Sequence, residues 1–266
     1  MIDKNSFSKK LNTDVFGRHF YSLDTIDSTN RYALELARSG EPQGTVVAAD
    51  YQTGGKGRLN RSWISPPGKN LLFSIILYPQ KTIESAQKIT LGAAVSVHKT
   101  ITQLLAGLAI KDNTLEVKWP NDVIANDKKL CGILTESVLK NNRIAALVMG
   151  FGINLNMDPE DAGPDLAPGV ISLKRIIGQE INRSGFLAAF LKQFEADYFD
   201  MEKHSYINVV AQWKARSNCF GKSIRVNTGY GMEDAVFYDL SEQGYLMYKK
   251  SDGTIWELAA GEALWQ

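Results

Sequence analysis

The sequence contains few of the residues that bind metals or form covalent cross-links. Its 266 residues include only two cysteines, Cys131 and Cys219, which lie far apart, and three histidines without metal-ligand spacing. This scarcity excludes a disulfide framework and a Cys/His zinc site. It favours a reducing, cytoplasmic location in which each cysteine serves as a small buried hydrophobe.

The chain also lacks a strong net charge and a long apolar run. Its formal net charge is +1, so a general nucleic-acid-coating role is not expected. No segment approaches the roughly 20 apolar residues that span a bilayer, and the polar start, residues 1–10, is no secretory signal. The sequence therefore predicts neither a membrane partner nor extensive DNA contact.

The common nucleotide-binding fingerprints are missing as well. A P-loop needs a glycine five residues before its Gly-Lys-Ser, yet Arg216 stands there ahead of Gly221-Lys222-Ser223. The pairs at Gly55–Gly57 and Gly150–Gly152 both lack the third glycine of the dinucleotide motif. The sequence therefore predicts neither a P-loop nor a Rossmann fold.

Apolar periodicity instead predicts an α+β chain that begins with a polar lead over residues 1–17. Strands are expected at Arg18–Leu23, Thr45–Asp50, Asn70–Tyr78, Leu115–Trp119, Val123–Ala125, Lys129–Leu139 and Arg143–Asn154. Helices are expected from Asp27 or Ser28 to Gly40 and over residues 82–107, 172–178 and 183–204. Hairpin turns are expected at Asn126-Asp127 and Asn141-Asn142, and an irregular loop over residues 158–169.

The pattern changes near the C-terminus to short alternating strands. They are expected at Ser223–Asn227, Ala235–Leu240 and Tyr245–Lys249, with turns at Thr228-Gly229, Gln243-Gly244 and Asp252-Gly253. We therefore expect a lead over residues 1–17, a larger α/β part over 18–218 and a small β-barrel over 219–266.

The most informative segment is Gly54–Trp63, which we call the Gly/Arg loop. It holds three glycines, three cations and a tryptophan, with no acid among them. Glycines let a backbone approach a ligand closely, and cations without local counter-ions imply an anion from outside. The loop predicts binding of a small anion such as a phosphate group.

Three further groups each allow a functional and a purely structural interpretation. In Lys118-Trp119-Pro120-Asn121-Asp122, the lysine ends a buried strand and needs an anionic partner, unless it reaches water above a plain turn. Ser28-Thr29-Asn30 either caps a helix or binds a neutral polar ligand group. Residues 150–154 could equally be a strand that another backbone approaches closely.

Taken in order, these elements resemble the biotin protein ligases in their short form, which lacks an N-terminal DNA-binding domain. The shared motifs are Ser28-Thr29-Asn30, the Gly/Arg loop, Lys118–Asp122, Lys129 with Gly132-Ile133-Leu134, and Gly152-Ile153-Asn154. The resemblance implies a class II synthetase-like catalytic domain, a mixed sheet flanked by helices, and an SH3-like β-barrel. With only 17 residues ahead of the first matching strand, we expect no repressor activity.

The resemblance also implies a reaction. Biotin and ATP would form biotinyl-5′-AMP with Mg²⁺, and biotin would pass to a lysine in the biotin carrier domain of a biotin-dependent carboxylase. Members of that family include homodimers.

The resemblance assigns roles to residues by motif position. The catalytic residues would be Lys118, Arg58 and Arg61. Biotin would be bound by Ser28, Thr29, Asn30, Gln52, Gly55, Gly57, Arg58, Lys118 and Gly132. The nucleotide would be bound by Lys56, Arg58, Arg61, Trp63, Lys118, Asn121 and Asn154. Asp122 is the one candidate Mg²⁺ contact, and Lys56 stands where the family commonly has an arginine with its bidentate fork.

Two alternatives remain. A lipoate ligase or octanoyltransferase would share the fold, with Cys131 as a nucleophile in the second case, although no histidine lies near it in sequence and the Lys118–Asp122 block favours biotin. A non-catalytic biotin-binding protein would not need the cations Arg58, Arg61 and Lys118.

Overall fold

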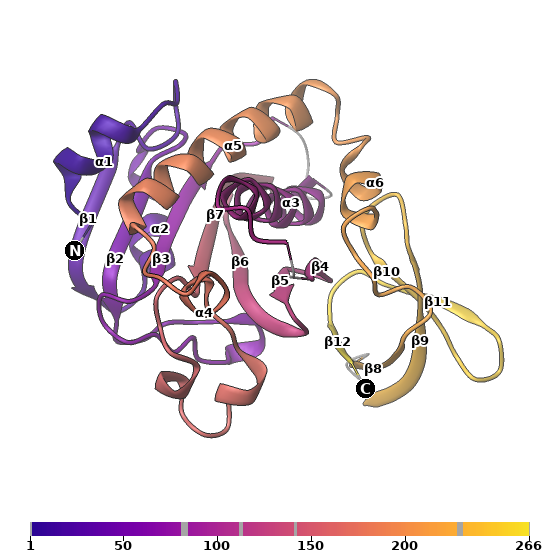
Figure 1. Ribbon diagram of the computed structural model, residues 1–266. Helices are drawn as coiled ribbons and strands as arrows, with labels where there is room; N and C mark the ends of the chain where they lie inside the picture. Colours follow the sequence, from indigo (N-terminus) through magenta and orange to yellow (C-terminus); the bar gives the residue numbers. More distant parts are fainter. Residues whose placement is uncertain (1, 81–84, 112–113, 141–142, 228–230, 266) are drawn as a thin grey trace.

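The computed structural model describes residues 2–80, 85–111, 114–140, 143–227 and 231–265, and it contains two sheets (Figure 1). The large sheet has the strand order β1-β2-β3-β7-β6-β5-β4, and the small one β11-β10-β9-β8-β12. Among the strands of these described residues, only β1 and β2 pair with each other in parallel. This matches the predicted mixed sheet with a small C-terminal β structure.

The elements follow the predicted order closely. The large sheet consists of β1 (Phe20–Ile26), β2 (Val46–Gln52), β3 (Leu71–Leu77), β4 (Leu115–Lys118), β5 (Asp122–Ala125), β6 (Lys128–Lys140) and β7 (Arg143–Ile153). The helices are α1 (Lys4–Lys10), α2 (Thr29–Ser39), α3 (Ser85–Gly107), α4 (Leu173–Ile177), α5 (Arg183–Lys203) and α6 (Val209–Lys214). The small sheet consists of β8 (Ser223–Asn227), β9 (Met232–Leu240), β10 (Leu246–Lys249), β11 (Ile255–Leu258) and β12 (Glu262–Trp265).

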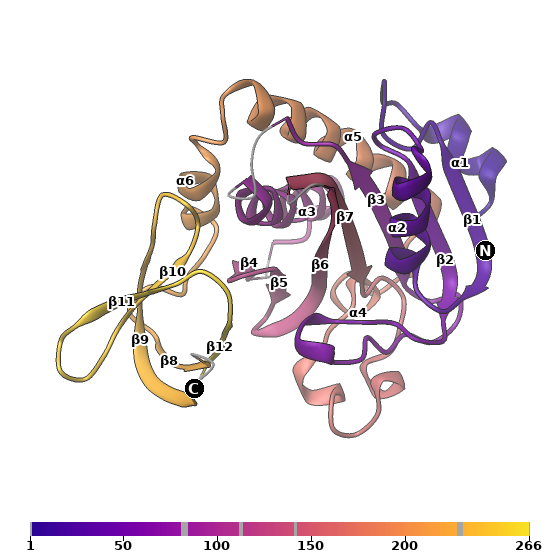
Figure 2. The same cartoon turned by 180° about the vertical axis from the view of Figure 1, so that it is seen from behind.

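Helices cover both faces of the large sheet because its strand side chains are apolar on both sides. On one face, Phe73 stacks on Phe151 at 4.8 Å between ring centroids, and both contact Phe190 of α5. Figure 1 shows α3 and α5 across this face, and Figure 2 shows α2 on the opposite one. There Ala33 and Ala37 of α2 belong to a second buried cluster with strand residues.

Local signals in the sequence set several boundaries correctly. Helix α2 begins after its N-cap Ser28 and ends at Gly40, whose φ of 88° is the left-handed conformation that glycine favours. Asn126 and Asp127 have φ of 51° and 61° in the β5–β6 turn, as expected for a tight hairpin. The first residues of the helix predicted over 82–107, residues 82–84, lie outside the described residues. The predicted turns at Asn141-Asn142 and Thr228-Gly229 also lie outside them.

Two helices were not predicted. Residues 1–17 were expected to be a polar lead, but α1 forms there and Phe7 is fully buried. Helix α6 follows α5 and buries Trp213. Both helices are short, and tertiary packing of a single large side chain outweighs their weak local patterns.

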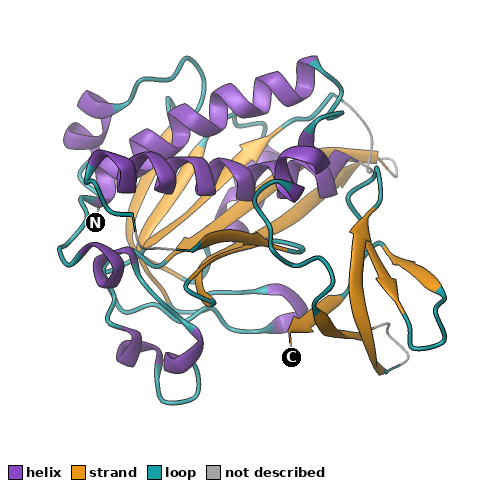
Figure 3. Cartoon of the chain, turned by 45° about the vertical axis from the view of Figure 1, so that its right-hand side comes forward, coloured by secondary structure: helices purple, strands orange, loops and turns teal. Residues whose placement is uncertain are grey.

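The two sheets share one core. The predicted division at residues 218 and 219 falls between α6 and β8, and Figure 3 shows the small sheet beside the large one. Nevertheless, buried side chains of β9 and β10 belong to the same continuous cluster as those of β3 and β7. No helix in the described part of the chain is long and apolar enough to cross a membrane.

A buried carboxylate fastens the N-terminal segment to α5. Glu195 is 9% exposed and accepts hydrogen bonds from the backbone N–H groups of Asp14 and Val15 at 2.7 Å and of Phe16 at 2.6 Å. These three donors are satisfied by one side chain on a distant helix, which fixes the chain just ahead of β1.

Replacement of this carboxylate should destabilise the protein. Glu195→Ala leaves three backbone donors without their acceptor and should lower the free energy of unfolding by about 2–4 kcal/mol, whereas Glu195→Gln, which keeps one acceptor, should lose less. Urea denaturation measures both, with the exposed Glu35→Gln as the control. A stability of Glu195→Ala equal to that of the control would contradict this account.

Candidate active site

The parallel pairing of β1 with β2 brings the first site residues together. Parallel strands end at the same edge of a sheet, and Ile26 pairs with Gln52 at that edge. Helix α2 begins just after β1, so Thr29 donates to Gln52 Oε1 from its backbone nitrogen at 2.7 Å and from its hydroxyl at 3.0 Å. Ser28, Thr29 and Asn30 are all buried at this helix start.

Beside the start of α2, glycines leave part of one face of the large sheet without side chains. Gly132 of β6 pairs with Gly152 of β7, and Leu134 pairs with Gly150. The Trp63 indole lies on the cleared face, because a Cβ at Gly152 would meet it at 2.3 Å and one at Gly132 at 2.8 Å. Its buried Nε1 has no hydrogen-bond partner among the described residues, so a ligand acceptor could satisfy it.

The β4–β5 hairpin supplies the next group. Lys118 pairs with Asp122 across the hairpin, and burial lowers the pKa of Lys118 while the Asp122 carboxylate opposes that shift. Asn121 donates to Ile133 O at 2.5 Å, which ties the turn to β6. Lys129 Nζ lies 2.9 Å from Asp122 Oδ1 and 5.6 Å from the Trp63 ring centroid.

The Gly/Arg loop closes on itself and contacts the small sheet. Gly57 N donates to Arg61 O at 2.7 Å, and Trp63 N donates to Gly55 O at 2.9 Å. Arg58 donates to Gly261 O at 2.5 Å, and Arg61 pairs bidentately with the Glu262 carboxylate. Burial lowers the pKa of Arg58 because its positive charge is poorly hydrated, and the carboxylates of Asp122 and Glu262 oppose this shift.

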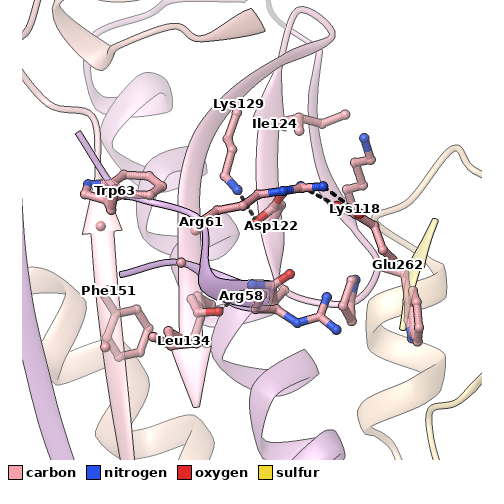
Figure 4. A pocket seen from close by; sticks show the side chains of 18 of the residues that line it. Arg58, Arg61, Trp63, Lys118, Asp122, Ile124, Lys129, Leu134, Phe151 and Glu262 are labelled. Atoms are coloured by element: carbon pink, nitrogen blue, oxygen red, sulfur yellow. Dashed lines mark hydrogen bonds and ion pairs between the residues drawn. The ribbon is translucent and has the colours of Figure 1, made fainter. Parts of the chain in front are cut away.

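The start of α2, the glycine face, the β4–β5 hairpin and the Gly/Arg loop all contribute residues to one cavity of about 790 Å³. Figure 4 shows Trp63, Phe151 and Leu134 on one side of it and Lys118 and Glu262 on the other. The predicted site residues that line it are Ser28, Thr29, Asn30, Gln52, Lys56, Gly57, Arg58, Arg61, Trp63, Lys118, Asn121, Asp122 and Gly132. Size and mixed lining suit a ligand larger than a single phosphate.

Two predicted site residues lie outside this lining. Gly55 packs against the other end of the Gly/Arg loop, where a Cβ would meet Trp63 O at 2.6 Å. Asn154 is 2% exposed and hydrogen-bonds with Asn70 and with Lys129 O. Both positions hold other site segments in place.

Sequence reasoning did not include several lining residues. Lys129 could have been included from the sequence, because it belongs to the motif of Lys129 with Gly132-Ile133-Leu134. Lys222 lies just ahead of β8 and Glu262 begins β12, and both reach the cavity only through the tertiary fold. Glu262 contacts Arg61, which lies 201 residues earlier in the sequence.

Comparison with known proteins identifies the family. The sequence profile of the biotin/lipoate A/B protein ligase family matches residues 22–154. The chain is 34% identical to the bifunctional ligase/repressor BirA of Bacillus subtilis over 243 residues, which are 91% of this chain and 73% of that protein. This chain belongs to the biotin/lipoate A/B protein ligase family.

Other members of the family resemble it over most of their length. The chain is 30% identical to the biotin–[acetyl-CoA-carboxylase] ligase of Paracoccus denitrificans, covering 87% of this chain and 94% of the relative. The structure resembles a biotin protein ligase from Aquifex aeolicus in complex with biotin and ATP. That likeness has a TM-score of 0.76 and 27% identity, over 94% of this chain and 99% of the other. The chain is thus an enzyme of the biotin protein ligase type.

The cysteines distinguish this chain from a family member that would use a thiol nucleophile. Cys131 is fully buried, and burial raises its pKa far above the usual range of a thiol. Cys219 is 2% exposed and burial raises its pKa to about 12. Because the thiolate is the nucleophile, neither cysteine is suited to carry an acyl group.

The contact between Trp63 and the glycine face predicts the effect of a single methyl group. Gly152→Ala should displace the indole and expose it to solvent, so Trp63 should be oxidised severalfold faster by N-bromosuccinimide, as located by peptide mass spectrometry. Gly107→Ala is the matched control, because a Cβ there meets nothing within 4 Å. Equal oxidation rates in the two variants would show that the indole does not rest on Gly152.

Proposed function

We propose that this chain is an ATP-dependent biotin–protein ligase that forms biotinyl-5′-AMP and then transfers biotin to a lysine of a biotin carrier domain. One observation carries the proposal: a single cavity is lined by neutral polar groups at the start of α2 and by the cations Arg58, Arg61 and Lys118. The polar groups suit a ureido ring, and the cations suit a carboxylate and a triphosphate.

In the first step the biotin carboxylate attacks the α-phosphorus of ATP, and the bond to pyrophosphate breaks. Both reactants are anions, so the main task of the protein is to hold them together and to stabilise the charge that develops. Lys118 would bridge the carboxylate and the α-phosphate, while Arg58 and Arg61 would contact the phosphates. The partial burial of Lys118 and Arg58 strengthens these contacts, because less water screens them.

In the second step the amine of an acceptor lysine attacks the acyl carbon of the adenylate, and AMP leaves. We propose that Trp63 covers the adenylate, with Asn121 on the nucleotide side. The Gly/Arg loop, which contacts Gly261 and Glu262, would limit the access of water to the acyl-adenylate.

Magnesium would enter chiefly with the nucleotide. The described residues contain no group of three or more His, Cys, Asp or Glu side chains that could hold a metal ion. Mg²⁺ commonly keeps waters and binds one or two carboxylates plus substrate phosphates, which fits a pocket offering single carboxylates such as Asp122. The bound ion would neutralise phosphate charge.

The decisive experiment is transfer of labelled biotin to a biotin carrier domain with Mg-ATP. We expect the label on one carrier lysine and stoichiometric pyrophosphate release. Biotin binding without pyrophosphate release would instead indicate a binding protein, and incorporation of lipoate but not biotin would indicate the related ligase class.

Lys118 should be essential for the first step. Lys118→Ala should lower the rate of biotin-dependent pyrophosphate release about 10²–10³-fold, the usual effect of losing one charge-stabilising group. Glu35→Gln serves as the control. Pyrophosphate release by Lys118→Ala at the wild-type rate would refute the role.

The same lysine should shape the pH profile. Lys118 acts as a cation, so activity should fall as pH rises through its pKa, and burial places that pKa below its usual value of 10.5. The guanidinium of Lys118→Arg stays protonated, so its residual rate should lack this alkaline fall. An identical fall in both proteins would assign it to another group.

A further inference from the structure

A chain of polar side chains runs from β6 to the cavity. It starts at Glu136 and passes through Asn30, Ser74 and Thr29 to Gln52. Thr29, Asn30 and Gln52 line the cavity, whereas Ser74 is fully buried behind them. Glu136 is half-buried and is not part of the lining, so it would act on a ligand only through Asn30.

Two acceptors set the direction of the Asn30 amide, and the Glu136 carboxylate makes the shorter contact. Asn30 Nδ2 lies 2.7 Å from Glu136 Oε2 and 3.1 Å from Leu134 O, and an ionised carboxylate and a carbonyl can only accept hydrogen bonds. The amide nitrogen must therefore face them both. This leaves Asn30 Oδ1 turned toward Ser74 Oγ, at 2.6 Å.

The remaining contacts contain too few hydrogens. The oxygen–oxygen distances are 2.6 Å from Asn30 to Ser74, 2.8 Å from Ser74 to Thr29 and 3.0 Å from Thr29 to Gln52. Both ends of this row are carbonyl oxygens, since the Thr29 backbone N–H fixes Gln52 Oε1 inward at 2.7 Å. Two hydroxyl hydrogens must serve three contacts, so the row is one hydrogen short.

We infer that Glu136 is a positioning residue that makes this wall of the cavity a hydrogen-bond acceptor, selecting a ligand that brings an N–H group. The inference rests on the proposed function, in which the ureido ring of biotin supplies two N–H groups. A ureido N–H directed at Thr29 or Gln52 provides the missing hydrogen. Without the carboxylate only the longer contact with Leu134 O, at 3.1 Å, still holds the Asn30 amide nitrogen in place. Rotation of the amide is then easier, and a turned amide donates to Ser74 and completes the row without a ligand.

The first test is biotin binding by calorimetry without ATP. Glu136→Leu should weaken binding about tenfold and Glu136→Gln less, because a neutral acceptor replaces a charged one. Glu35→Gln makes the same chemical change on the exposed face of α2 and should bind as the wild type does. Unchanged binding by Glu136→Leu would overturn the inference.

The second test separates positioning from a packing defect. The probe is biotin methylated at one ureido nitrogen, with each nitrogen tested in turn. The wild type should bind biotin at least tenfold more tightly than at least one probe. Glu136→Leu should reduce this ratio of the two affinities severalfold, while the KM for ATP stays unchanged. A packing defect would weaken both ligands alike and leave the ratio at its wild-type value, which would overturn the inference.

Ser74→Ala provides an independent variant. It removes one hydroxyl, so the hydroxyl hydrogen of Thr29 can point to Gln52 Oε1. The ratio of the affinities for biotin and for the methylated probe should therefore also fall, although Glu136 keeps its contact with Asn30. A wild-type ratio in Ser74→Ala would contradict the hydrogen count. Failure of the wild type to bind biotin at all would reject the proposed function itself, an outcome distinct from an unchanged ratio.

Discussion

The register between β6 and β7 is the constraint on which the site depends. It sets Gly132 opposite Gly152 and Gly150 opposite Leu134, so three of the four positions in this patch of the large sheet carry no side chain. Trp63 lies over this patch, and Asn30 fits against Gly150, where a Cβ would approach its Oδ1 to 2.1 Å. A slip of one residue would put the bulky side chains of Ile133 and Phe151 on this face in place of the glycines.

The second constraint is electrostatic. Cations converge on a partly buried cavity, and the fold offsets their charge internally: Glu262 pairs with Arg61, and Asp122 pairs with Lys129. A ligand phosphate would thus exchange partners with existing carboxylates, which costs less than burying an uncompensated charge. This arrangement lets the protein gather several cations in one pocket of a chain with nearly zero net charge.

Much of this arrangement could be predicted from the sequence. Ser28 and Gly40 gave the ends of α2, and Asn126-Asp127 gave the β5–β6 turn, because caps and turns are determined by adjacent residues. The motif residues were identified as a group, and most of them meet in one cavity. Local pattern is sufficient where the chemistry lies within a few residues.

Contacts between distant segments could not be predicted in this way. Phe7 makes α1 part of the core by packing against the ring of Phe20, at 4.2 Å between centroids. The spacing of apolar residues in the sequence does not predict this contact. Glu262 reaches Arg61 across 201 residues, and Glu136 resembles any polar strand residue until Asn30 is seen beside it. Such partners become visible only when topology and register are known.

The Trp119 side chain links the two sheets in a way that affects how the protein can be divided. Its indole is 2% exposed, and its Nε1 donates to Gly244 O, in the turn between β9 and β10, at 3.1 Å. Residues of both sheets enclose this ring in a shared core. A fragment without the small sheet would present a large apolar surface and an unsatisfied N–H to water, beside the lysine that ends β4. The C-terminal segment is thus a wall of the cavity and an internal part of the fold, and cutting the chain ahead of it would not yield a self-contained enzyme.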